Sequence, residues 1–370
     1  MPRKLRIAYF AHTLRSDWNN GNAHFLRGLV RALRADGHEV TAYEPESEWS
    51  IQNLRAEDHG QASLDRFMET YADLDIQTYG PEETEELWRE RLRGTQFVLL
   101  HEWNPPLLAQ LLLKLRDELG FKLLFHDTHH RASSSPESFA VLGLERFDGV
   151  LAFGAALQTI YRERFGVRNV WVLHEAADTT VFRPMADVAR GAEIVWIGNW
   201  GEGERTEEIR GYLLEPAAKL APAFRTKIYG VRYPEEGHEA LRAHGVEYGG
   251  YLPNLDAPRV YASARLTVHI PRQQYTKAMT GIPTIRVFEA LACGIPLVSA
   301  PWQDTEGLFR SEDFYMANAP ADMEQAMRRL LESPALAAEQ ARRGRETVLA
   351  RHTCEHRAAE LAGIFEELGA

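Results

Sequence analysis

Long apolar runs, cysteines and surplus positive charge are scarce in this sequence of 370 residues. Its apolar stretches fall short of the roughly 20 residues that span a bilayer, so we predict no integral membrane segment. The two cysteines, Cys293 and Cys354, lie far apart and in no metal-ligand spacing, which suits a reducing cytoplasm and argues against a disulfide scaffold. A net charge of −11 argues against a nucleic-acid partner held by a general basic field.

Two further patterns are missing near the start of the chain. Residues 1–10 have only a short apolar run before His12, which is typical of a first β-strand and not of a signal peptide. The strand is followed by residues 12–15, His-Thr-Leu-Arg, and not by a Gly-x-Gly-x-x-Gly turn. A nicotinamide-dependent oxidoreductase is therefore disfavoured, and a cytoplasmic protein of another class is expected.

The chain is long enough for two domains, each with a substantial core. Short apolar runs alternate with amphipathic stretches in both halves, which predicts two Rossmann-like α/β domains with parallel sheets. Helices are expected near 61–72, 82–93 and 155–165. The predicted strands are 5–11, 38–43, 97–101, 122–125, 149–153, 170–173, 193–198, 226–230, 266–270 and 296–299. We predict domains at 1–183 and 192–350, a linker at 182–191, and a C-terminal helix at 351–370 that packs back towards the first domain.

The most informative stretch runs from Gly281 to Ser299. It predicts a Gly/Pro turn, a short helix with one carboxylate, a glycine cap and a buried strand. The amino end of a helix offers unpaired backbone N–H groups and a positive dipole end, which suit a phosphate. Glu289, a turn further on, is placed to accept hydrogen bonds from a diol such as ribose. The same pattern also fits a capped helix in which Glu289 is merely solvated.

This stretch resembles the donor-site signature of GT-B glycosyltransferases, in which a glutamate before a Gly-x-Pro strand start holds the nucleotide ribose. The wider pattern resembles the CgeB-like (spore-maturation-type) glycosyltransferase family. The motifs that carry this likeness are Gly198-Asn199-Trp200 with Arg205, Tyr229-Gly230-Val231, Gly249 to Pro253, Gly281-Ile282-Pro283 with Arg286, and Arg351-His352-Thr353 with His356-Arg357. The resemblance implies a GT-B fold, with an N-terminal acceptor domain facing a C-terminal nucleotide-sugar domain across a cleft.

The resemblance also implies a donor-binding role for ten residues. Glu289 is expected to bind the ribose hydroxyls, and Arg205 to face the diphosphate. Tyr251 and Leu252 are expected to line the base pocket, while Arg286 is either a second phosphate ligand or an ion-pair residue. The full set is Asn199, Arg205, Tyr251, Leu252, Gly281, Ile282, Pro283, Thr284, Arg286 and Glu289. Because GT-B enzymes hold the diphosphate with backbone dipoles and cationic side chains, no metal and no cofactor is implied besides the nucleotide-diphosphate sugar, a UDP-sugar being favoured.

One position departs from a familiar pattern. Many retaining GT-B enzymes carry a second glutamate, eight positions before the ribose glutamate, which contacts the donor sugar. That position is Gly281 here. The departure puts retention in doubt and favours direct displacement with inversion at the anomeric carbon.

Polar residues at predicted strand ends of the first domain are candidates for the acceptor side, since ligands collect there in open α/β sheets. His126 and Asp127 are the first choices for the base that deprotonates an acceptor hydroxyl. Adjacent side chains on a strand point opposite ways, so the two face the cleft together only if a turn begins there. His12 ranks behind them. The other acceptor-side candidates are Asp17, Asn20, Gly21, His24, Glu102, His129 and His130.

The histidines and aspartate of 126–130 also admit a metal site, which we rank below the metal-free interpretation. The predicted function is transfer of a sugar from a nucleotide-diphosphate sugar to an unidentified acceptor. The alternatives are an isomerase that resembles nucleotide-sugar epimerases, and a non-catalytic protein that binds sugar nucleotides.

Overall fold

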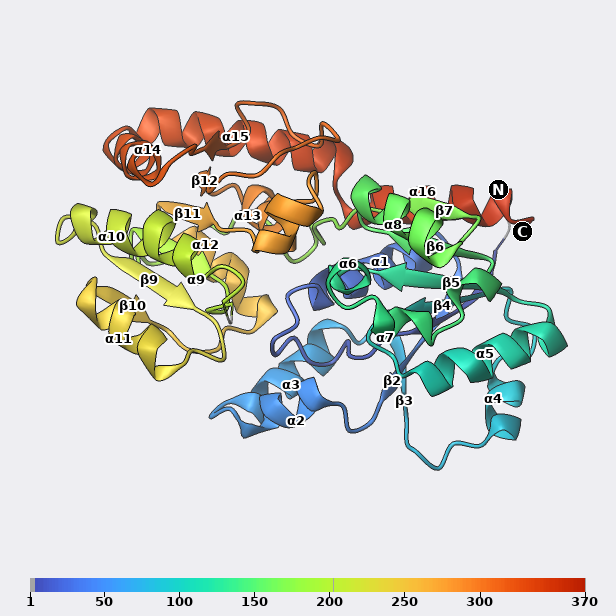
Figure 1. The fold of residues 1–370 in the computed structure, drawn as a ribbon. Helices are drawn as coiled ribbons and strands as arrows, with labels where there is room; N and C mark the ends of the chain where they lie inside the picture. The colour runs from blue at the N-terminus through green and yellow to red at the C-terminus, as the bar shows by residue number, and fades with distance from the viewer. Residues whose placement is uncertain (1–3, 202, 370) are drawn as a thin grey trace. The chain divides into compact units, whose positions relative to one another are not determined.

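The computed structural model describes residues 4–201 and 203–369. The chain forms two compact units, Met1–Glu175 with Cys354–Ala370, and Ala176–Thr353. The second unit thus begins upstream of the linker expected at 182–191. Its two ends are joined, because the backbone N–H of Ala177 donates to the carbonyl of His352 at 3.0 Å. Each unit is built on its own parallel sheet (Figure 1).

The sheet of the first unit has the strand order β3-β2-β1-β4-β5-β6-β7. Its strands are β1 (Arg6–Phe10), β2 (Glu39–Pro45), β3 (Asp75–Tyr79), β4 (Phe97–His101), β5 (Lys122–Asp127), β6 (Gly149–Ala152) and β7 (Val170–Val172). The helices are α1 (Ala23–Ala35), α2 (Trp49–Ala56), α3 (Gly60–Thr70), α4 (Glu85–Arg91), α5 (Pro106–Leu119), α6 (Arg131–Ser134), α7 (Glu137–Ala140), η1 (Leu144–Arg146) and α8 (Ala155–Phe165). The central strand β4 is wholly buried and β5 is buried except for Lys122, which is why their sequences are mostly apolar runs and do not alternate.

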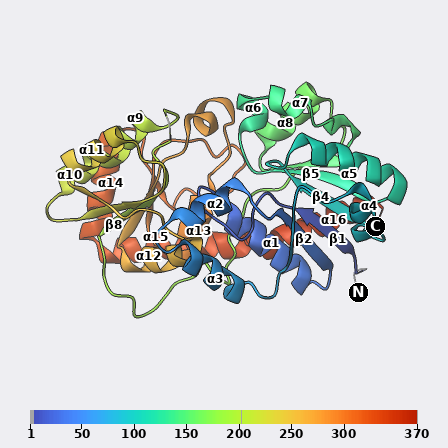
Figure 2. The same ribbon diagram turned by 90° about the horizontal axis from the view of Figure 1, so that it is seen from below.

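The last helix, α16 (Cys354–Glu367), belongs to this first unit and lies beside α1 (Figure 2). The ring of Phe365 packs at a tilt against that of Phe97 in β4, with ring centroids 4.0 Å apart. The guanidinium of Arg357 donates to the carbonyl of His174 at 2.9 Å. Aromatic packing and a charged hydrogen bond therefore anchor both halves of α16.

The sheet of the second unit has the order β10-β9-β8-β11-β12-β13. Its strands are β8 (Ile194–Ile197), β9 (Thr226–Tyr229), β10 (Val246–Tyr248), β11 (Leu266–His269), β12 (Leu297–Ser299) and β13 (Tyr315–Met316). The helices are α9 (Thr206–Ile209), η2 (Arg210–Leu214), α10 (Glu215–Leu220), α11 (Glu235–Ala243), η3 (Asn254–Asp256), α12 (Ala257–Ser263), η4 (Gln274–Ala278), α13 (Ile285–Cys293), α14 (Pro320–Glu332) and α15 (Pro334–Arg351). Pairing is parallel throughout, so all carboxyl ends of the strands lie at one edge.

The two-domain parallel α/β prediction is confirmed, and three edge strands, β3, β10 and β13, were missed. β3 carries Asp75-Ile76-Gln77-Thr78-Tyr79, whose side chains are half-buried or exposed, so it lacks the apolar run of a central strand. β13 has only two residues. No helix in the described part of the chain is long and apolar enough to cross a membrane.

Strand order fixes where each sheet is able to receive a ligand. In the first unit the order reverses between β1 and β4, and in the second between β8 and β11. At such a reversal the connections leave in opposite directions and open a crevice at the carboxyl ends of the two strands. These two positions are therefore the candidate ligand sites of the two sheets.

Candidate functional site

Arg205 bridges the reversal point of the second unit. Its guanidinium donates to the carbonyl of Asn199, after β8, at 2.7 and 3.2 Å, and to the carbonyl of Ile270, after β11, at 3.2 Å. Within residues 4–201 and 203–369, no carboxylate pairs with it. Burial lowers the pKa of Arg205 to about 10, so the side chain is still cationic at neutral pH. The crevice of the second unit therefore contains a fixed positive charge.

Beside Arg205, neighbouring strand ends approach so closely that only glycine fits. A Cβ on Gly230 would lie 2.2 Å from the carbonyl oxygen of Gly198. The side chain of Asn199 accepts a hydrogen bond from the backbone N–H of Val231 at 2.9 Å. The side chain of Asn199 thus holds the end of β8 next to the loop that follows β9.

The turn before α13 has the geometry that the sequence indicated. Gly281 has a φ of +98°, a left-handed conformation that favours glycine. Thr284 precedes the helix, and its hydroxyl lies 3.0 Å from Nε2 of His269. The other ring nitrogen of His269 lies 2.8 Å from the hydroxyl of Ser299. His269 therefore ties the turn to the ends of β11 and β12.

His269 was missed as a site residue, although it lies within the predicted strand 266–270 and ends β11. Burial, and then the charge of Arg205, lower its pKa from the ordinary 6.5 to about 3. It is neutral at physiological pH and serves to position the turn. A polar side chain within an otherwise apolar strand was the available signal.

Glu289 and Arg286 form an ion pair on α13, with Nη1 and Oε2 2.5 Å apart. The carboxylate is fully buried, while Arg286 is partly exposed. The alternative in which Glu289 is merely solvated is thus wrong. Of the two roles considered for Arg286, the structure has the ion pair, because residues three apart on a helix lie on one face. The neighbouring charge of Glu289 adds to the burial that raises the pKa of the Tyr261 phenol well above its usual value.

The expected base-pocket residues lie in the loop after β10. Tyr251 and Leu252 are half-buried and follow Gly250, whose carbonyl accepts from the N–H of Gly230 at 2.9 Å. This bond ties the loop to the strand end that follows β9. The remaining turn residues, Ile282 and Pro283, are buried. All ten donor-side residues are in the second unit, and Arg205, Asn199 and the turn lie at the carboxyl edge of its sheet.

In the first unit, two histidines bridge the reversal point. His12, after β1, stacks on His101, the last residue of β4, with ring centroids 5.2 Å apart and Nδ1 atoms 3.3 Å apart. Nδ2 of Asn20 lies 3.4 Å from Nε2 of His12, and Nε2 of His101 lies 3.0 Å from the hydroxyl of Thr128. If the amide nitrogen of Asn20 donates to Nε2 of His12, the hydrogen of His12 is on Nδ1 and Nε2 has the lone pair. Burial lowers the pKa of His12 to about 3 and keeps the ring neutral.

A pair of buried carboxyl groups lies next to these histidines. Oδ2 of Asp127 accepts from the hydroxyl of Tyr161 at 2.6 Å, and Oδ1 accepts from the backbone N–H of His129 at 2.9 Å. Glu102 is fully buried nearby, 3.8 Å from the guanidinium of Arg131. Burial raises the pKa of Asp127 to about 6. Burial, and then the neighbouring charge of Asp127, raise the pKa of Glu102 well above its usual value.

The ring of His126 meets this network only edge-on, with its centroid 5.9 Å from that of the His101 ring. It is fully buried beside Phe25, and its Nδ1 lies 2.8 Å from the hydroxyl of Tyr9. Burial lowers its pKa to about 3. Its proposed role as the base is therefore not supported, because an acceptor has no access to it. Successive side chains of β5 point to opposite faces, and His126 faces the packed one.

The other acceptor-side candidates are mostly structural. Asp17 pairs with Arg27 at 3.2 Å, and His24 is buried with Nδ1 3.3 Å from the carbonyl of Gly21. Nδ1 of His130 lies 2.9 Å from the hydroxyl of Ser134. His129 is half-buried against Trp103. Within residues 4–201 and 203–369, no group of three or more histidine, cysteine or acidic side chains is arranged to hold a metal ion.

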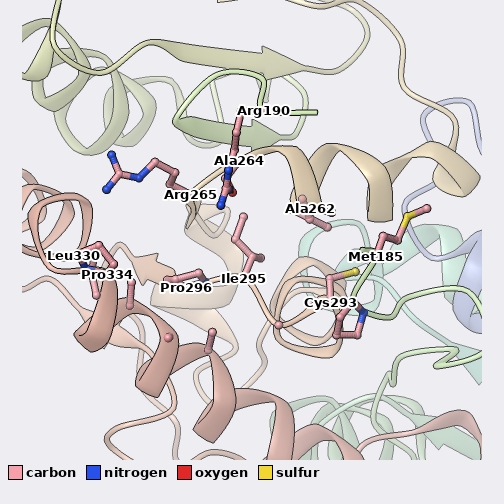
Figure 3. Close-up of a pocket in the computed structure, with 16 residues that line it drawn as sticks. Met185, Arg190, Ala262, Ala264, Arg265, Cys293, Ile295, Pro296, Leu330 and Pro334 are labelled. Carbon is pink, nitrogen blue, oxygen red and sulfur yellow. The ribbon is translucent and has the colours of Figure 1, made fainter. Parts of the chain in front are cut away.

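A cavity of about 380 Å³ lies elsewhere in the second unit (Figure 3). Cys293, Ile295 and Pro296 line it at the amino end of β12, the edge of the sheet opposite to the Gly281 turn. The guanidinium of Arg190, on its wall, donates to the carbonyl of Ala264 at 3.0 Å. The cavity therefore does not belong to the strand-end site.

Comparisons with known proteins show which proteins this chain resembles in sequence and in fold. Residues 205–363 match the family model described as glycosyl transferase-like. Anabaena HepE, solved with UDP and glucose, has a TM-score of 0.72 at 13% identity over 98% of this chain and 100% of its own. Sucrose-phosphate synthase from Thermosynechococcus elongatus has a TM-score of 0.65 at 17% identity, over 99% of each chain. An alpha-glucosyltransferase, solved with UDP and a 13-mer DNA, has a TM-score of 0.69 at 13% identity over 98% of this chain and 100% of its own.

The match to the glycosyl transferase-like model covers less than half of the chain, and the similar solved structures show that the whole chain has the two-domain GT-B fold. The expected fold is thereby confirmed, with two Rossmann-like units and a helical C-terminal segment. No curated protein sequence matches the chain. The family match begins at Arg205 and includes the turn and Glu289, so it falls on the half of the molecule in which the sequence predicted the donor site.

Proposed function

We propose that this protein moves a sugar from a UDP-sugar to a hydroxyl group of an acceptor without a metal ion. The observation that carries the proposal is the position of Arg205. A buried cation held by backbone carbonyls at the reversal point, beside the open amino end of α13, suits a diphosphate. Similar folds that were solved with UDP support this donor.

Arg205 and the Gly281–Thr284 turn are proposed to stabilise the negative charge that develops on the leaving UDP. Arg205 is locked in place by two strand ends, so little reorganisation is needed when that charge forms. Glu289 is proposed to accept hydrogen bonds from the ribose once its contact with Arg286 opens. Arg286 is thus proposed to cover the carboxylate of Glu289 until the ribose binds, and not to be a second phosphate ligand.

His12 is proposed as the base on the acceptor side, in place of His126 and Asp127. Its Nε2 lone pair has only a long contact with Asn20, whereas both oxygens of Asp127 accept short hydrogen bonds. The acceptor oxygen attacks the anomeric carbon, the bond from that carbon to the phosphate oxygen breaks, and the hydroxyl proton passes to His12. This single displacement inverts the anomeric configuration.

The CgeB-like family is the proposed subclass. Its motif glycines support it, since Gly198, Gly230 and Gly250 meet through their backbones at the strand ends of the second unit. A cytoplasmic location and an acceptor other than nucleic acid stay predictions.

The decisive experiment measures UDP binding by calorimetry in the wild type, Arg205→Ala and Arg225→Ala. Arg225 is a matched control, because it removes the same charge from the exposed opposite edge of the same sheet. We expect Arg205→Ala to weaken binding by about 10- to 100-fold, typical for charge-assisted hydrogen bonds, and Arg225→Ala to leave it unchanged. Equal affinities in all three proteins would remove the assigned donor site.

Product analysis then tests the reaction itself. A panel of UDP-sugars and hydroxyl acceptors, assayed in excess chelator, should yield a glycoside of inverted configuration. Loss of turnover in chelator with recovery in Mg²⁺ would refute metal independence. An epimerised donor without a glycoside would establish the isomerase alternative, and binding without any turnover would establish the non-catalytic one.

A further inference from the structure

The space beside Gly281 is occupied by the loop between β12 and β13. A Cβ on Gly281 would lie 2.2 Å from the hydroxyl of Thr305 and 3.4 Å from Oε1 of Glu306. A larger residue at 281 would require the side chain of Thr305 to shift. A carboxylate that is far away in the sequence thus lies next to the turn.

The Glu306 loop, residues 300–314, is held at several points. The carboxylate of Asp304 accepts from the backbone N–H groups of Leu308 and Phe309 at 3.0 and 2.9 Å. Nε2 of His352 lies 2.8 Å from the carbonyl of Leu308. Arg351 donates to the same carbonyl and, at 3.2 Å, to that of Gly307. Hydrogen bonds on both sides of residue 306 therefore fix its backbone, and the Arg351-His352 motif gains a structural explanation.

The charge of Glu306 decides what it is able to contact. A diphosphate at the Gly281–Thr284 turn would repel a carboxylate, so Glu306 does not favour the phosphates. The donor sugar is attached to the outer phosphate and presents uncharged hydroxyl donors. Two oxygens of one carboxylate accept well from adjacent hydroxyls. The half-buried position of Glu306 strengthens such bonds by limiting competition from water.

We propose that Glu306 recognises the hydroxyl groups of the donor sugar, in the place where Gly281 lacks a carboxylate. This inference rests on the proposed function, since it assumes that a nucleotide-diphosphate sugar binds at the turn. It makes Glu306 a specificity-determining residue of the donor. It also assigns sugar recognition to a loop outside α13.

The test compares UDP with UDP-glucose, UDP-galactose and UDP-N-acetylglucosamine in binding to the wild type, Glu306→Gln and Glu312→Gln. Glu312 is a matched control, an exposed glutamate of the same loop. We expect Glu306→Gln to weaken the best-bound UDP-sugar by about 10- to 100-fold, and to leave UDP affinity unchanged or slightly tighter. Glu312→Gln should change neither affinity.

Each other outcome has a separate meaning. If Glu306→Gln weakens UDP and the UDP-sugar equally, the residue only supports the loop and the inference is wrong. An unchanged ratio of the two affinities overturns it as well, with the donor site intact. If the wild type binds none of these nucleotides, the proposed function fails first and the inference fails with it. Glu306→Asp should restore part of the preference for the UDP-sugar, which a purely structural role would not predict.

Discussion

In both units, side chains connect the two strand ends at the point where the strand order reverses. The chemistry of these side chains differs between the units. In the second unit the bridge is Arg205, which keeps its positive charge at any physiological pH. In the first unit it is the His12–His101 pair, whose rings burial keeps neutral. A fixed cation suits a permanent anion such as a diphosphate, whereas a neutral imidazole suits a hydroxyl proton. In the proposed function, the second unit binds the donor diphosphate and the first unit accepts the proton of the acceptor hydroxyl.

Replacing the histidine of the first bridge should have the largest effect. His12→Ala is expected to lower kcat by 10²- to 10⁴-fold with UDP affinity unchanged, because a general base contributes about this much. Steady-state kinetics and calorimetry check both quantities. His59→Ala, which removes an exposed histidine from the same unit, is the control. Full kcat in His12→Ala would return Asp127 to first place among the candidate bases.

Removing the carboxylate of Glu289 on α13 should weaken the binding of UDP, which is proposed to bind to the second unit. Glu289→Ala is expected to weaken UDP binding by roughly 1.5–3 kcal/mol, typical of hydrogen bonds to a charged group. Calorimetry gives the affinity, and circular dichroism checks the fold, since Glu289 is buried. Unchanged UDP affinity in a folded variant would show that Glu289 does not bind the ribose.

The carboxyl pair of the first unit should make stability depend on pH. Because burial raises the pKa of Asp127 from 3.8 to about 6, the folded state holds its proton more tightly than the unfolded state. Stability contributed by the protonated form is therefore lost as pH rises from about 4 through about 6. Asp127→Asn should flatten this slope by at most about 1.4 kcal/mol per pH unit, one proton's worth. Thermal unfolding at several pH values measures it, and parallel curves for the two proteins would contradict the raised pKa.

The smallest effect is expected from Arg286→Ala. If Arg286 only covers Glu289, UDP affinity should stay the same or rise slightly, because the ribose no longer competes with the ion pair. If Arg286 is instead a phosphate ligand, affinity should fall about as far as in Arg205→Ala. One calorimetric comparison of the two arginine variants separates these cases and shows whether the second unit has one phosphate-binding cation or two.

Local sequence patterns were sufficient for most of the architecture. Apolar runs such as Phe97–His101 became central strands, and the Gly-x-Pro-Thr turn preceded α13 as expected. β3 was missed because an edge strand with exposed side chains has no apolar run. The pairing of Arg286 with Glu289 was predictable in principle, since a spacing of three on a helix brings side chains together.

By itself, the sequence determined the alternation of strands and helices and the glycine turn, because both depend on residues that are neighbours in the chain. Only the tertiary structure decided which polar groups meet. His12 and His101 are 89 residues apart, and they touch because β1 and β4 are adjacent in the sheet. The side chain of Glu306 reaches Gly281 because a long loop returns over the start of α13. His126 and Asp127, adjacent in sequence, point apart because a strand alternates its faces, so burial separated two residues that the sequence had paired.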